Sequence, residues 1–192
     1  IYTVKYDIDS VRKYNKVFQE GELTYVSEKI HGANARYVYH NDEMYCGSRT
    51  LWKKEDKNCL WWKALTNEMY EFCYNNPDVI LYGEVYGQVQ DLKYDLNNKV
   101  RFAAFDILKD NKWLDADNFL DLCFDNNIDT VPLIKLNWEF NWDELQNLCE
   151  GQSLIANHIR EGCVIKPMKE RTDSKIGRVV LKLVGNDYLG RK

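Results

Sequence analysis

Short runs of apolar or alternating residues recur along the chain, and they constrain its fold more than any other feature. Runs of this length are typical of β-strands. We expect strands at residues 23–28, 35–40, 43–47, 79–86, 100–108, 162–168 and 178–184. The residue pairs Asn41-Asp42 and Asp110-Asn111 each follow or interrupt such runs and are typical of tight hairpins. This order favours antiparallel pairing, and therefore an α+β fold over a doubly wound parallel one.

Helical spacing of apolar residues separates some of the expected strands. We expect helices at residues 60–74, 116–126 and 142–149, the second after an Asp115 cap and the third after Asn141. Polar stretches at residues 50–58, 87–99 and 169–177 are expected to be loops long enough to move. With 192 residues, of which 45% are hydrophobic, the chain can bury a sizeable core in one domain.

The charge of the chain is unevenly spread. Its formal net charge is −4, which argues against a basic protein that coats nucleic acid. Residues 160–192 carry nine basic and four acidic side chains, so this segment is net +5 and the rest of the chain is net −9. An acidic body with a basic final segment favours local phosphate handling over the wrapping of a duplex.

The six cysteines lack the close pairs that a zinc site needs. We therefore expect reduced thiols in a cytoplasmic compartment, and no zinc. No apolar run reaches the ~18–20 residues that cross a bilayer and no signal peptide opens the sequence, so no membrane partner is expected. The chain starts at Ile1 rather than at methionine, which leaves open that it is a fragment. A monomer is expected, although the sequence does not determine the oligomeric state.

A lysine stands where one of the expected strands ends. Lys29 follows the run 23–28, and Gly32 permits a tight exit of the chain or the close approach of a ligand. A lysine amine is a nucleophile only when it is neutral, which requires burial or neighbouring positive charge because an ordinary lysine has a pKa of ~10.4. The segment also suits an ordinary hairpin with a surface lysine, so taken alone it leaves both interpretations open.

Charged residues also interrupt or border other apolar runs. Glu84 stands between two glycines in the run 79–86, Glu161 directly precedes the run 162–168, and Lys182 interrupts the run 178–184. A charge in an apolar strand is costly unless it meets a hydroxyl or an opposite charge. We therefore expect each of these side chains to have a partner or a ligand.

Three further residues suit a site for phosphates or bases. Arg49 follows the run 43–47 and offers a guanidinium for bidentate contact with a phosphate or a hydroxyl. Phe105 has small neighbours that leave room for a base to stack on its ring, although core packing explains them equally well. Lys166 follows Glu161 by five residues, an odd spacing that places the two on opposite faces of a regular strand and gives them separate roles.

Taken in order along nearly the whole chain, these residues resemble motifs of the covalent nucleotidyltransferase superfamily of polynucleotide ligases and capping enzymes. They are most similar to those of ATP-dependent RNA ligases of the RNA ligase 2 type. Lys29-Ile30-His31-Gly32 resembles the nucleophile motif Lys-x-x-Gly, and with Asn34 it has the Lys-x-His-Gly-x-Asn form typical of RNA ligases. Further segments resemble the later motifs of the family, in order: Ser48-Arg49, Gly83-Glu84, Phe105-Asp106, Glu161-Gly162 with Val164 and Lys166, and Lys182.

The resemblance implies an adenylyltransferase domain over residues 1–192, with an α+β fold of two antiparallel β-sheets and flanking helices that form a nucleotide-binding cleft. Lys29 would attack ATP and form lysyl-AMP, AMP would pass to an RNA 5′-phosphate, and a 3′-hydroxyl would displace AMP and seal the strand. The implied nucleotide-binding residues are Glu28 and Ile30 through their backbone, with Asn34, Arg49, Glu84, Phe105, Lys166 and Lys182. Glu161 is implied as the ligand of a hydrated Mg²⁺ or Mn²⁺, and His31 and Asp106 as residues that assist AMP transfer.

The last motif departs from the family pattern. It usually reads Lys-x-Lys, but Val184 stands two residues after Lys182, so the second phosphate ligand is missing or supplied by Lys175 or Arg178. The chain also ends ten residues after Lys182, so we expect either that a flanking domain, which many ligases use to engage nucleic acid, is absent from it or that the protein seals strands with a minimal core. A DNA-joining ligase or a capping guanylyltransferase of the same superfamily is an alternative, as is a non-catalytic module that binds nucleotides or RNA ends.

Overall fold

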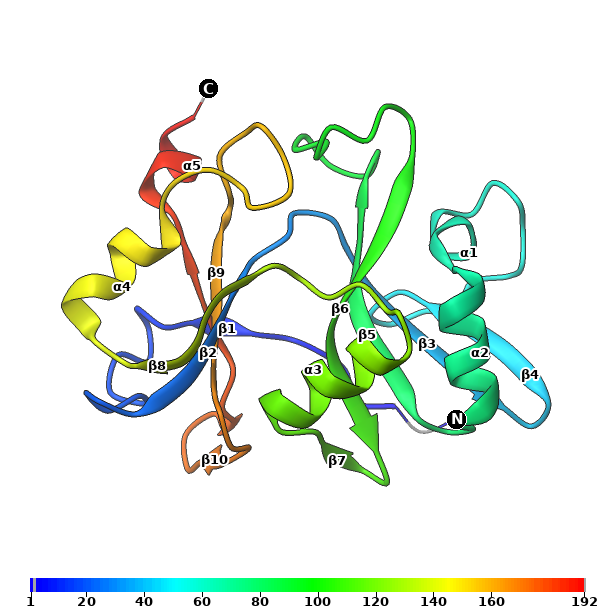
Figure 1. The fold of residues 1–192 in the computed structure, drawn as a ribbon, viewed down its shortest axis with the longest axis horizontal. Coiled ribbons are helices and arrows are strands. Elements are labelled where there is room, and N and C mark those ends of the chain that lie inside the picture. The colour runs from blue at the N-terminus through cyan, green and yellow to red at the C-terminus, as the bar shows by residue number, and fades with distance from the viewer. Residues whose placement is uncertain (2, 192) are drawn as a thin grey trace. The chain divides into compact units, whose positions relative to one another are not determined.

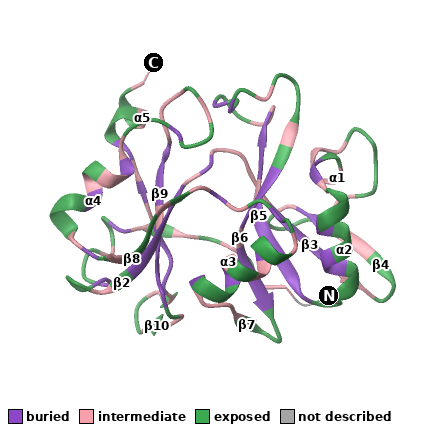
Figure 2. Cartoon of the chain, viewed as in Figure 1, coloured by how far each residue is buried: buried purple, intermediate pink, exposed green. Residues whose placement is uncertain are grey.

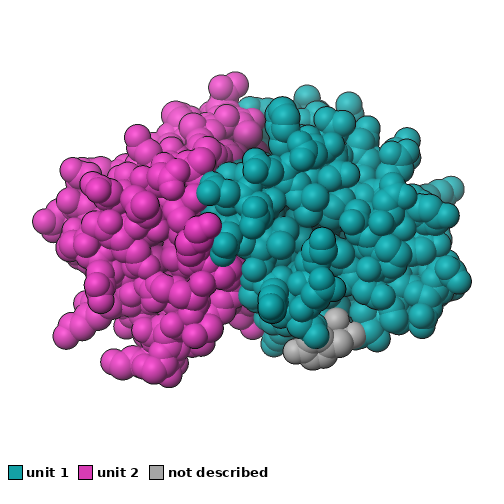
Figure 3. Space-filling model, turned by 60° about the horizontal axis from the view of Figure 1, so that its bottom comes forward, with its two compact units in different colours: residues 1–6, 31–131 teal, residues 7–30, 132–192 magenta. Residues whose placement is uncertain are grey.

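Two five-stranded sheets organise the chain, one in each of two units. The computed structural model describes residues 1 and 3–191. Unit 1 comprises residues 1–6 and 31–131, and unit 2 comprises residues 7–30 and 132–192 (Figure 3). Each unit buries its own hydrophobic core, and several strands are buried over most of their length (Figure 2).

The sheet of unit 1 is antiparallel throughout and has the strand order β4-β3-β5-β6-β7 (Figure 1). Its strands are β3 (Ala33–His40), β4 (Glu43–Gly47), β5 (Ile80–Gly87), β6 (Val100–Lys109) and β7 (Lys112–Trp113). The two expected hairpins are confirmed, because Asn41 and Asp42 have φ angles of 46° and 62°, and Asp110 and Asn111 of 52° and 60°. Positive φ at both central residues gives a turn whose twist matches that of the flanking strands.

Three helices complete the main core of unit 1. They are α1 (Leu60–Ala64), α2 (Asn67–Asn75) and α3 (Ala116–Asp125). Phe72 of α2 and Phe119 of α3 are buried in one cluster with Leu81 of β5. Alternate strand residues point to the other face of the sheet, where Val38 and Tyr82 form a second apolar cluster. The helices thus cover one face and leave the other to a smaller cluster.

The prediction of one helix over residues 60–74 is wrong in one respect, because the structure has two helices there. α1 ends at Ala64, and α2 begins after Thr66, whose Oγ1 accepts a hydrogen bond from the Met69 N–H at 3.2 Å. Thr66 has an extended backbone and caps the start of the second helix, so the helical conformation of the first does not continue through it. The apolar spacing concealed the break because Leu65, between the helices, packs against the same core.

The sheet of unit 2 has the order β1-β12-β9-β2-β8 and is antiparallel except for the edge pair β1 and β12. Its strands are β1 (Asp9–Ser10), β2 (Leu23–Glu28), β8 (Leu133–Glu139), β9 (Gly162–Pro167) and β12 (Leu181–Val184). The other elements of unit 2 are α4 (Trp142–Cys149), α5 (Asn186–Gly190) and the short pair β10 (Thr172–Asp173) and β11 (Gly177–Arg178). The expected α+β class with antiparallel sheets is confirmed.

Three differences from the expected elements lie in unit 2. Strand β8 was not expected, and it is a mostly exposed edge strand whose residues lack a clear alternation. The segment 169–177, expected to be a loop, contains most of the β10–β11 hairpin, and the strand expected from residue 178 begins only at Leu181.

Among the described residues, no helix has both the length and the apolarity needed to cross a membrane.

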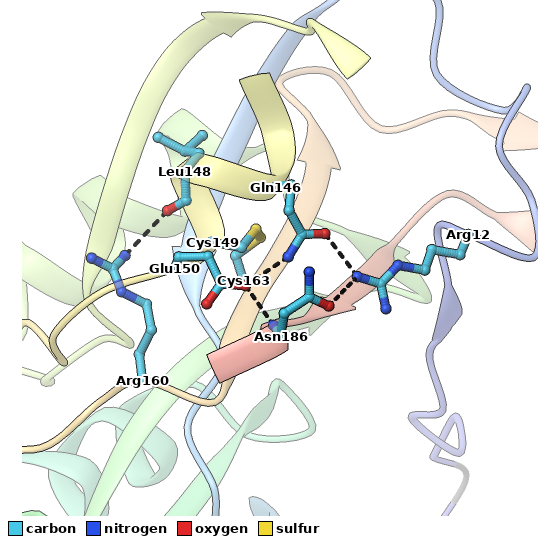
Figure 4. The surroundings of a disulfide bond; sticks show 8 residues. All are labelled: Arg12, Gln146, Leu148, Cys149, Glu150, Arg160, Cys163 and Asn186. Atoms are coloured by element: carbon cyan, nitrogen blue, oxygen red, sulfur yellow. Dashed lines mark hydrogen bonds between the residues drawn. A yellow bond between two sulfur atoms is a disulfide. The ribbon is translucent and has the colours of Figure 1, made fainter. Parts of the chain in front are cut away.

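The structure joins Cys149 and Cys163 in a disulfide, so the expectation that all six thiols are reduced is wrong for this pair (Figure 4). Cys149 ends α4 and Cys163 lies in β9, with Cα atoms 5.2 Å apart, a separation that a disulfide spans. Both lie in the core of unit 2, and their spacing of 14 residues gave no sequence signal. Of the cysteines with free thiols, Cys73 is fully buried, and burial raises the pKa of its thiol to about 12.

Candidate active site

Lys29 lies directly after β2 and pairs with the carboxylate expected to bind a metal. Its Nζ is 3.1 Å from Glu161 Oε2, and the two side chains are 19% and 11% exposed. The Lys29 N–H donates to the Gly162 carbonyl at 3.0 Å. Because β2 and β9 are antiparallel neighbours, the end of one and the start of the other meet, and residues 132 positions apart are brought together.

Glu28 and Ile30 flank this lysine, and both are buried. The Glu28 carboxylate accepts hydrogen bonds from Ser153 Oγ and from the Leu154 N–H, each at 2.7 Å. Its backbone N–H donates to the Pro132 carbonyl at 2.9 Å. The Glu28 side chain therefore holds the segment between α4 and β9, a use that the sequence did not indicate.

Two of the expected phosphate-binding lysines share one face of the unit 2 sheet. Lys182 of β12 pairs with Val164 of β9, so its side chain lies on the same face as that of Lys166, two residues further along β9. Lys166 is buried, with its Nζ 5.2 Å from the centroid of the Tyr25 ring. Two positive side chains on one face suit a ligand with phosphate groups.

The two residues considered for the missing phosphate ligand differ in their surroundings. Arg178 makes a two-pronged contact with Glu170, with Nε at 2.7 Å and Nη2 at 3.1 Å from its carboxylate oxygens. Lys175 is exposed in the turn of the β10–β11 hairpin. To bind a phosphate, Arg178 would have to break its contact with the Glu170 carboxylate, whereas Lys175 is already exposed to solvent.

Asn34 and Glu84 are direct cross-strand neighbours in unit 1, so their side chains lie on the same face of the sheet. Asn34 Oδ1 is buried and has no hydrogen-bond partner among the described residues. The Asn34 carbonyl accepts a hydrogen bond from Trp61 Nε1 at 3.1 Å, which fixes the backbone there. A buried amide oxygen without a partner is costly, and it points to a ligand that donates a hydrogen bond to it.

Gly32 is explained by packing within unit 1 rather than by a ligand. A Cβ at this position would lie 2.1 Å from the Val85 carbonyl oxygen of β5 and 3.1 Å from Glu84 Cγ. The glycine therefore allows the chain to approach the backbone of β5 as it enters β3. The expected tight exit of the chain is confirmed, and the backbone that Gly32 approaches closely is that of the protein's own strand β5.

Arg49 is exposed in the turn after β4, and this turn is well held. The Ser48 N–H donates to the Leu51 carbonyl at 2.8 Å, and the Ser48 carbonyl accepts from Arg36 Nε at 2.9 Å. Arg36 is itself buried against the Trp52 ring, and this burial lowers the pKa of its guanidinium. A fixed turn thus carries Arg49 at the surface of unit 1.

Phe105 and Asp106 of β6 both contact a residue near the start of the chain. The Tyr6 and Phe105 rings have centroids 4.5 Å apart and are tilted by 44°. The Tyr6 hydroxyl donates to Asp106 Oδ2 at 2.6 Å, and Asp106 is fully buried. Tyr6 therefore positions both residues of the Phe105-Asp106 motif.

His31 is the first residue of the second segment of unit 1, and loop residues 88–99 hold it. Its Nδ1 lies 3.1 Å from Asp91 Oδ1, and its N–H donates to the Tyr94 hydroxyl at 2.7 Å.

Sequence reasoning missed four residues that position the candidate site: Tyr6, Asp91, Tyr94 and Ser153. Tyr94, a large ring in the polar stretch 87–99, was a signal that the sequence contained, whereas Asp91 and Ser153 had none.

No group of three or more His, Cys, Asp or Glu side chains is placed to hold a metal ion within residues 1 and 3–191. Glu161 is therefore a single carboxylate donor. A Mg²⁺ ion commonly takes one or two carboxylates and completes its shell with water and substrate phosphates, so Glu161 fits such an ion when a nucleotide is bound.

A family model for RNA ligases matches residues 22–184, a range that contains every site residue expected from the sequence. The chain belongs to the RNA ligase family. No curated protein sequence is similar enough to add to this assignment.

Solved structures of Naegleria gruberi RNA ligase have the same fold as this RNA ligase family member. The TM-score is 0.83 for a variant with AMP and Mn at 21% identity, 0.81 for a variant with ATP and Mn at 22%, and 0.82 for the protein with PPi at 22%. Each match covers 97% of this chain and 57% of the Naegleria chain. The chain thus spans little more than half the length of these ligases.

Proposed function

We propose that residues 1–192 form the adenylyltransferase domain of an ATP-dependent RNA ligase. It would form lysyl-AMP, transfer the AMP to an RNA 5′-phosphate and seal that end to a 3′-hydroxyl. The observation that carries this proposal is the Lys29–Glu161 pair at the facing ends of β2 and β9, in a chain of the RNA ligase family. The ATP, AMP, PPi and Mn in the Naegleria ligase structures support ATP as substrate and a divalent cation beside it.

In the first step the Lys29 amine attacks the α-phosphorus of ATP. A P–N bond forms, the bond from phosphorus to the pyrophosphate oxygen breaks, and pyrophosphate leaves. Lys166 and Lys182, which share a face of the sheet, offset the negative charge of the phosphates. Lys175 is the candidate for the contact that Val184 does not supply.

Glu161 is the residue that would hold a divalent cation. Its carboxylate oxygen is a hard ligand of the kind that Mg²⁺ and Mn²⁺ bind, and it lies beside the amine that must reach the α-phosphate. When bound, the ion supplies positive charge to the phosphates during attack. Lys29 must lose its proton before attack, and a cation at Glu161 competes with the ammonium for the same carboxylate.

The nucleoside part of ATP is assigned to five residues. Arg49 and Glu84 contact the ribose hydroxyls, Phe105 stacks on the adenine, and the backbone of Glu28 and Ile30 reads the adenine edge. The fixed turn that presents Arg49, and the side chain of Glu84 on an otherwise apolar strand, support these roles. Adenine would replace solvent on the exposed part of the Phe105 ring.

The RNA end is handled in the later steps. An oxygen of the 5′-phosphate attacks the α-phosphorus of lysyl-AMP, the P–N bond breaks, and the Lys29 nitrogen takes up a proton from water and leaves as the amine. A 3′-hydroxyl then attacks the adenylated phosphate and AMP departs. Asn34 helps to place the phosphate or the RNA end, and its buried Oδ1, without a partner among the described residues, supports a ligand group there that donates a hydrogen bond, such as a hydroxyl. His31 and Asp106 assist the AMP transfer. The basic segment 160–192 contacts the RNA backbone.

The test is mass spectrometry of the intact protein after incubation with ATP and Mg²⁺, followed by peptide mapping. The wild type is expected to gain one AMP on Lys29, and Lys29→Ala to gain none. Lys57→Ala, which removes the same charge from an exposed loop, serves as the matched control and is expected to react like the wild type. An adduct that persists in Lys29→Ala overturns the proposal.

The same experiment separates the alternatives. Labelling by GTP in preference to ATP indicates a capping guanylyltransferase, and reversible ATP binding by the wild type without an adduct indicates a non-catalytic module. Once the adduct forms, nicked duplexes with RNA or DNA at the nick distinguish an RNA ligase from a DNA-joining ligase. Preferential sealing of the RNA nick is expected.

A further inference from the structure

Three residues of the loop 88–99 contact His31 and Gly32, the second and third residues after the nucleophile Lys29. Gln90 Nε2 donates to the Gly32 carbonyl at 3.4 Å, and the Tyr94 hydroxyl accepts from the His31 N–H at 2.7 Å. The Asp91 Oδ1 lies 3.1 Å from His31 Nδ1. Backbone and side chain of His31 are therefore both held by the same loop.

The loop is built to be a firm support. Tyr94 is 2% exposed and its ring meets that of Tyr86 edge to face, with centroids 5.2 Å apart. The loop is closed at its base by a hydrogen bond from the Gln88 N–H to the Lys99 carbonyl at 3.1 Å, and Leu92 is buried. The Asp91 side chain is itself 61% exposed, and its place beside the imidazole follows from the contacts that Gln90 and Tyr94 of the same loop make with Gly32 and His31.

We propose that Asp91 is a positioning residue that orients the His31 imidazole for AMP transfer to the RNA 5′-phosphate. This inference rests on the function proposed above. The Asp91 carboxylate, 3.1 Å from Nδ1, is placed to accept an Nδ1–H, which would favour one tautomer and one ring orientation and would make Nε2 the ring atom that meets a phosphate. The His31 side chain is 21% exposed, so a ligand can reach the ring.

The first experiment measures the three chemical steps separately in Asp91→Ala, Asp91→Asn and the matched control Asp95→Asn, which removes the same charge from the same loop. Asp91→Ala is expected to slow AMP transfer from isolated lysyl-AMP protein to a nicked RNA duplex about tenfold, because a misplaced group loses its alignment. Lysyl-AMP formation should change little. Asp91→Asn should recover most of the rate, since its amide oxygen still accepts from Nδ1–H, and Asp95→Asn should behave like the wild type.

The double variant decides whether Asp91 acts through His31. Once His31→Ala has removed the ring, Asp91→Ala should cause no further loss, because the two residues act as one unit. Losses that multiply in the double variant, or an Asp91→Ala protein that transfers AMP at the wild-type rate, overturn the proposal.

The ¹⁵N resonances of the His31 ring test the pair without any catalysis. At a pH where the ring is neutral, the wild type and Asp95→Asn should show the Nδ1–H tautomer, and Asp91→Ala should shift toward Nε2–H. Unchanged resonances in Asp91→Ala overturn the positioning role even if ligation proceeds. The expected shift in a protein that forms no lysyl-AMP supports the pair and counts against the proposed function alone.

Discussion

Replacing Glu28 tests how the residue beside the nucleophile holds unit 2 together. The carboxylate is 1% exposed and accepts two hydrogen bonds of 2.7 Å, from Ser153 Oγ and the Leu154 N–H. Hydrogen bonds to a charged group contribute about 1.5–3 kcal/mol each, and the cost of burying the carboxylate offsets part of their sum. We therefore expect Glu28→Ala to lower the free energy of unfolding by about 3 kcal/mol, since it also leaves the buried Ser153 hydroxyl without this acceptor.

Glu28→Gln separates the hydrogen bonds from the charge. Its amide oxygen still accepts from the Leu154 N–H, and the serine hydroxyl can rotate to accept from the new amide group. The expected loss is about 1 kcal/mol, the ordinary contribution of a neutral hydrogen bond. A clear order of stability, with glutamine between glutamate and alanine, indicates that hydrogen bonding rather than side-chain volume holds the segment.

The measurement is urea unfolding followed by far-ultraviolet circular dichroism. Glu139→Ala is the matched control, because it removes a carboxylate from the same sheet at an exposed position and should change the unfolding free energy by less than about 0.5 kcal/mol. If Glu28→Ala is as stable as Glu139→Ala, the two hydrogen bonds do not stabilise unit 2 and the reasoning fails.

Three other changes have defined outcomes. Gly32→Ala should yield little folded protein or cost more than about 3 kcal/mol, measured by the same unfolding assay, because its Cβ would meet the Val85 carbonyl at 2.1 Å. Iodoacetamide at neutral pH should label Cys59 and leave Cys73 unmodified in a peptide map, since burial raises the pKa of the Cys73 thiol to about 12. Burial alone would raise the pKa of Glu150, but hydrogen bonds from the first N–H groups of α5 outweigh it and lower the pKa below its usual 4.5. The stability that Glu150 contributes is therefore present above pH 4.5 and lost on acidification through the lowered pKa, and an acid titration of Glu150→Gln should lack that loss.

Much of the strand framework was predictable because it depends on local patterns. The runs at 23–28 and 43–47 are the strands β2 and β4 with the expected bounds, and Asn141 caps α4 by accepting from the Glu144 N–H. Asp115 precedes α3 as expected, but its side chain makes no capping hydrogen bond. Residue type thus located the helix start, while the contact that a cap makes depends on a side-chain rotamer that the sequence does not specify.

Features that depend on distant partners were not predictable. Strand β8 forms because an edge of β2 is available to it, and its own residues show no alternation between exposed and buried positions. The pairing of Cys149 with Cys163 requires that the end of α4 pack against β9, which no spacing along the chain reveals. Tyr6 contacts Asp106 across 100 positions, so its role follows from the fold rather than from its neighbours in sequence.

The nucleophile motif shows why a short pattern can be recognised while its support cannot. The boundary between the two units falls after Ile30, so Lys29 is held by Glu161 and Gly162 of unit 2, whereas His31 is held by Asp91 and Tyr94 of unit 1. Glu161 lies 132 positions from Lys29 and Tyr94 lies 63 positions from His31, and each unit supports a different residue of the motif. A change at Glu161 should therefore impair lysyl-AMP formation, and a change at Asp91 should leave that step intact and impair AMP transfer. Step-resolved kinetics on the two variants would show whether neighbouring residues of one motif depend on separate supports.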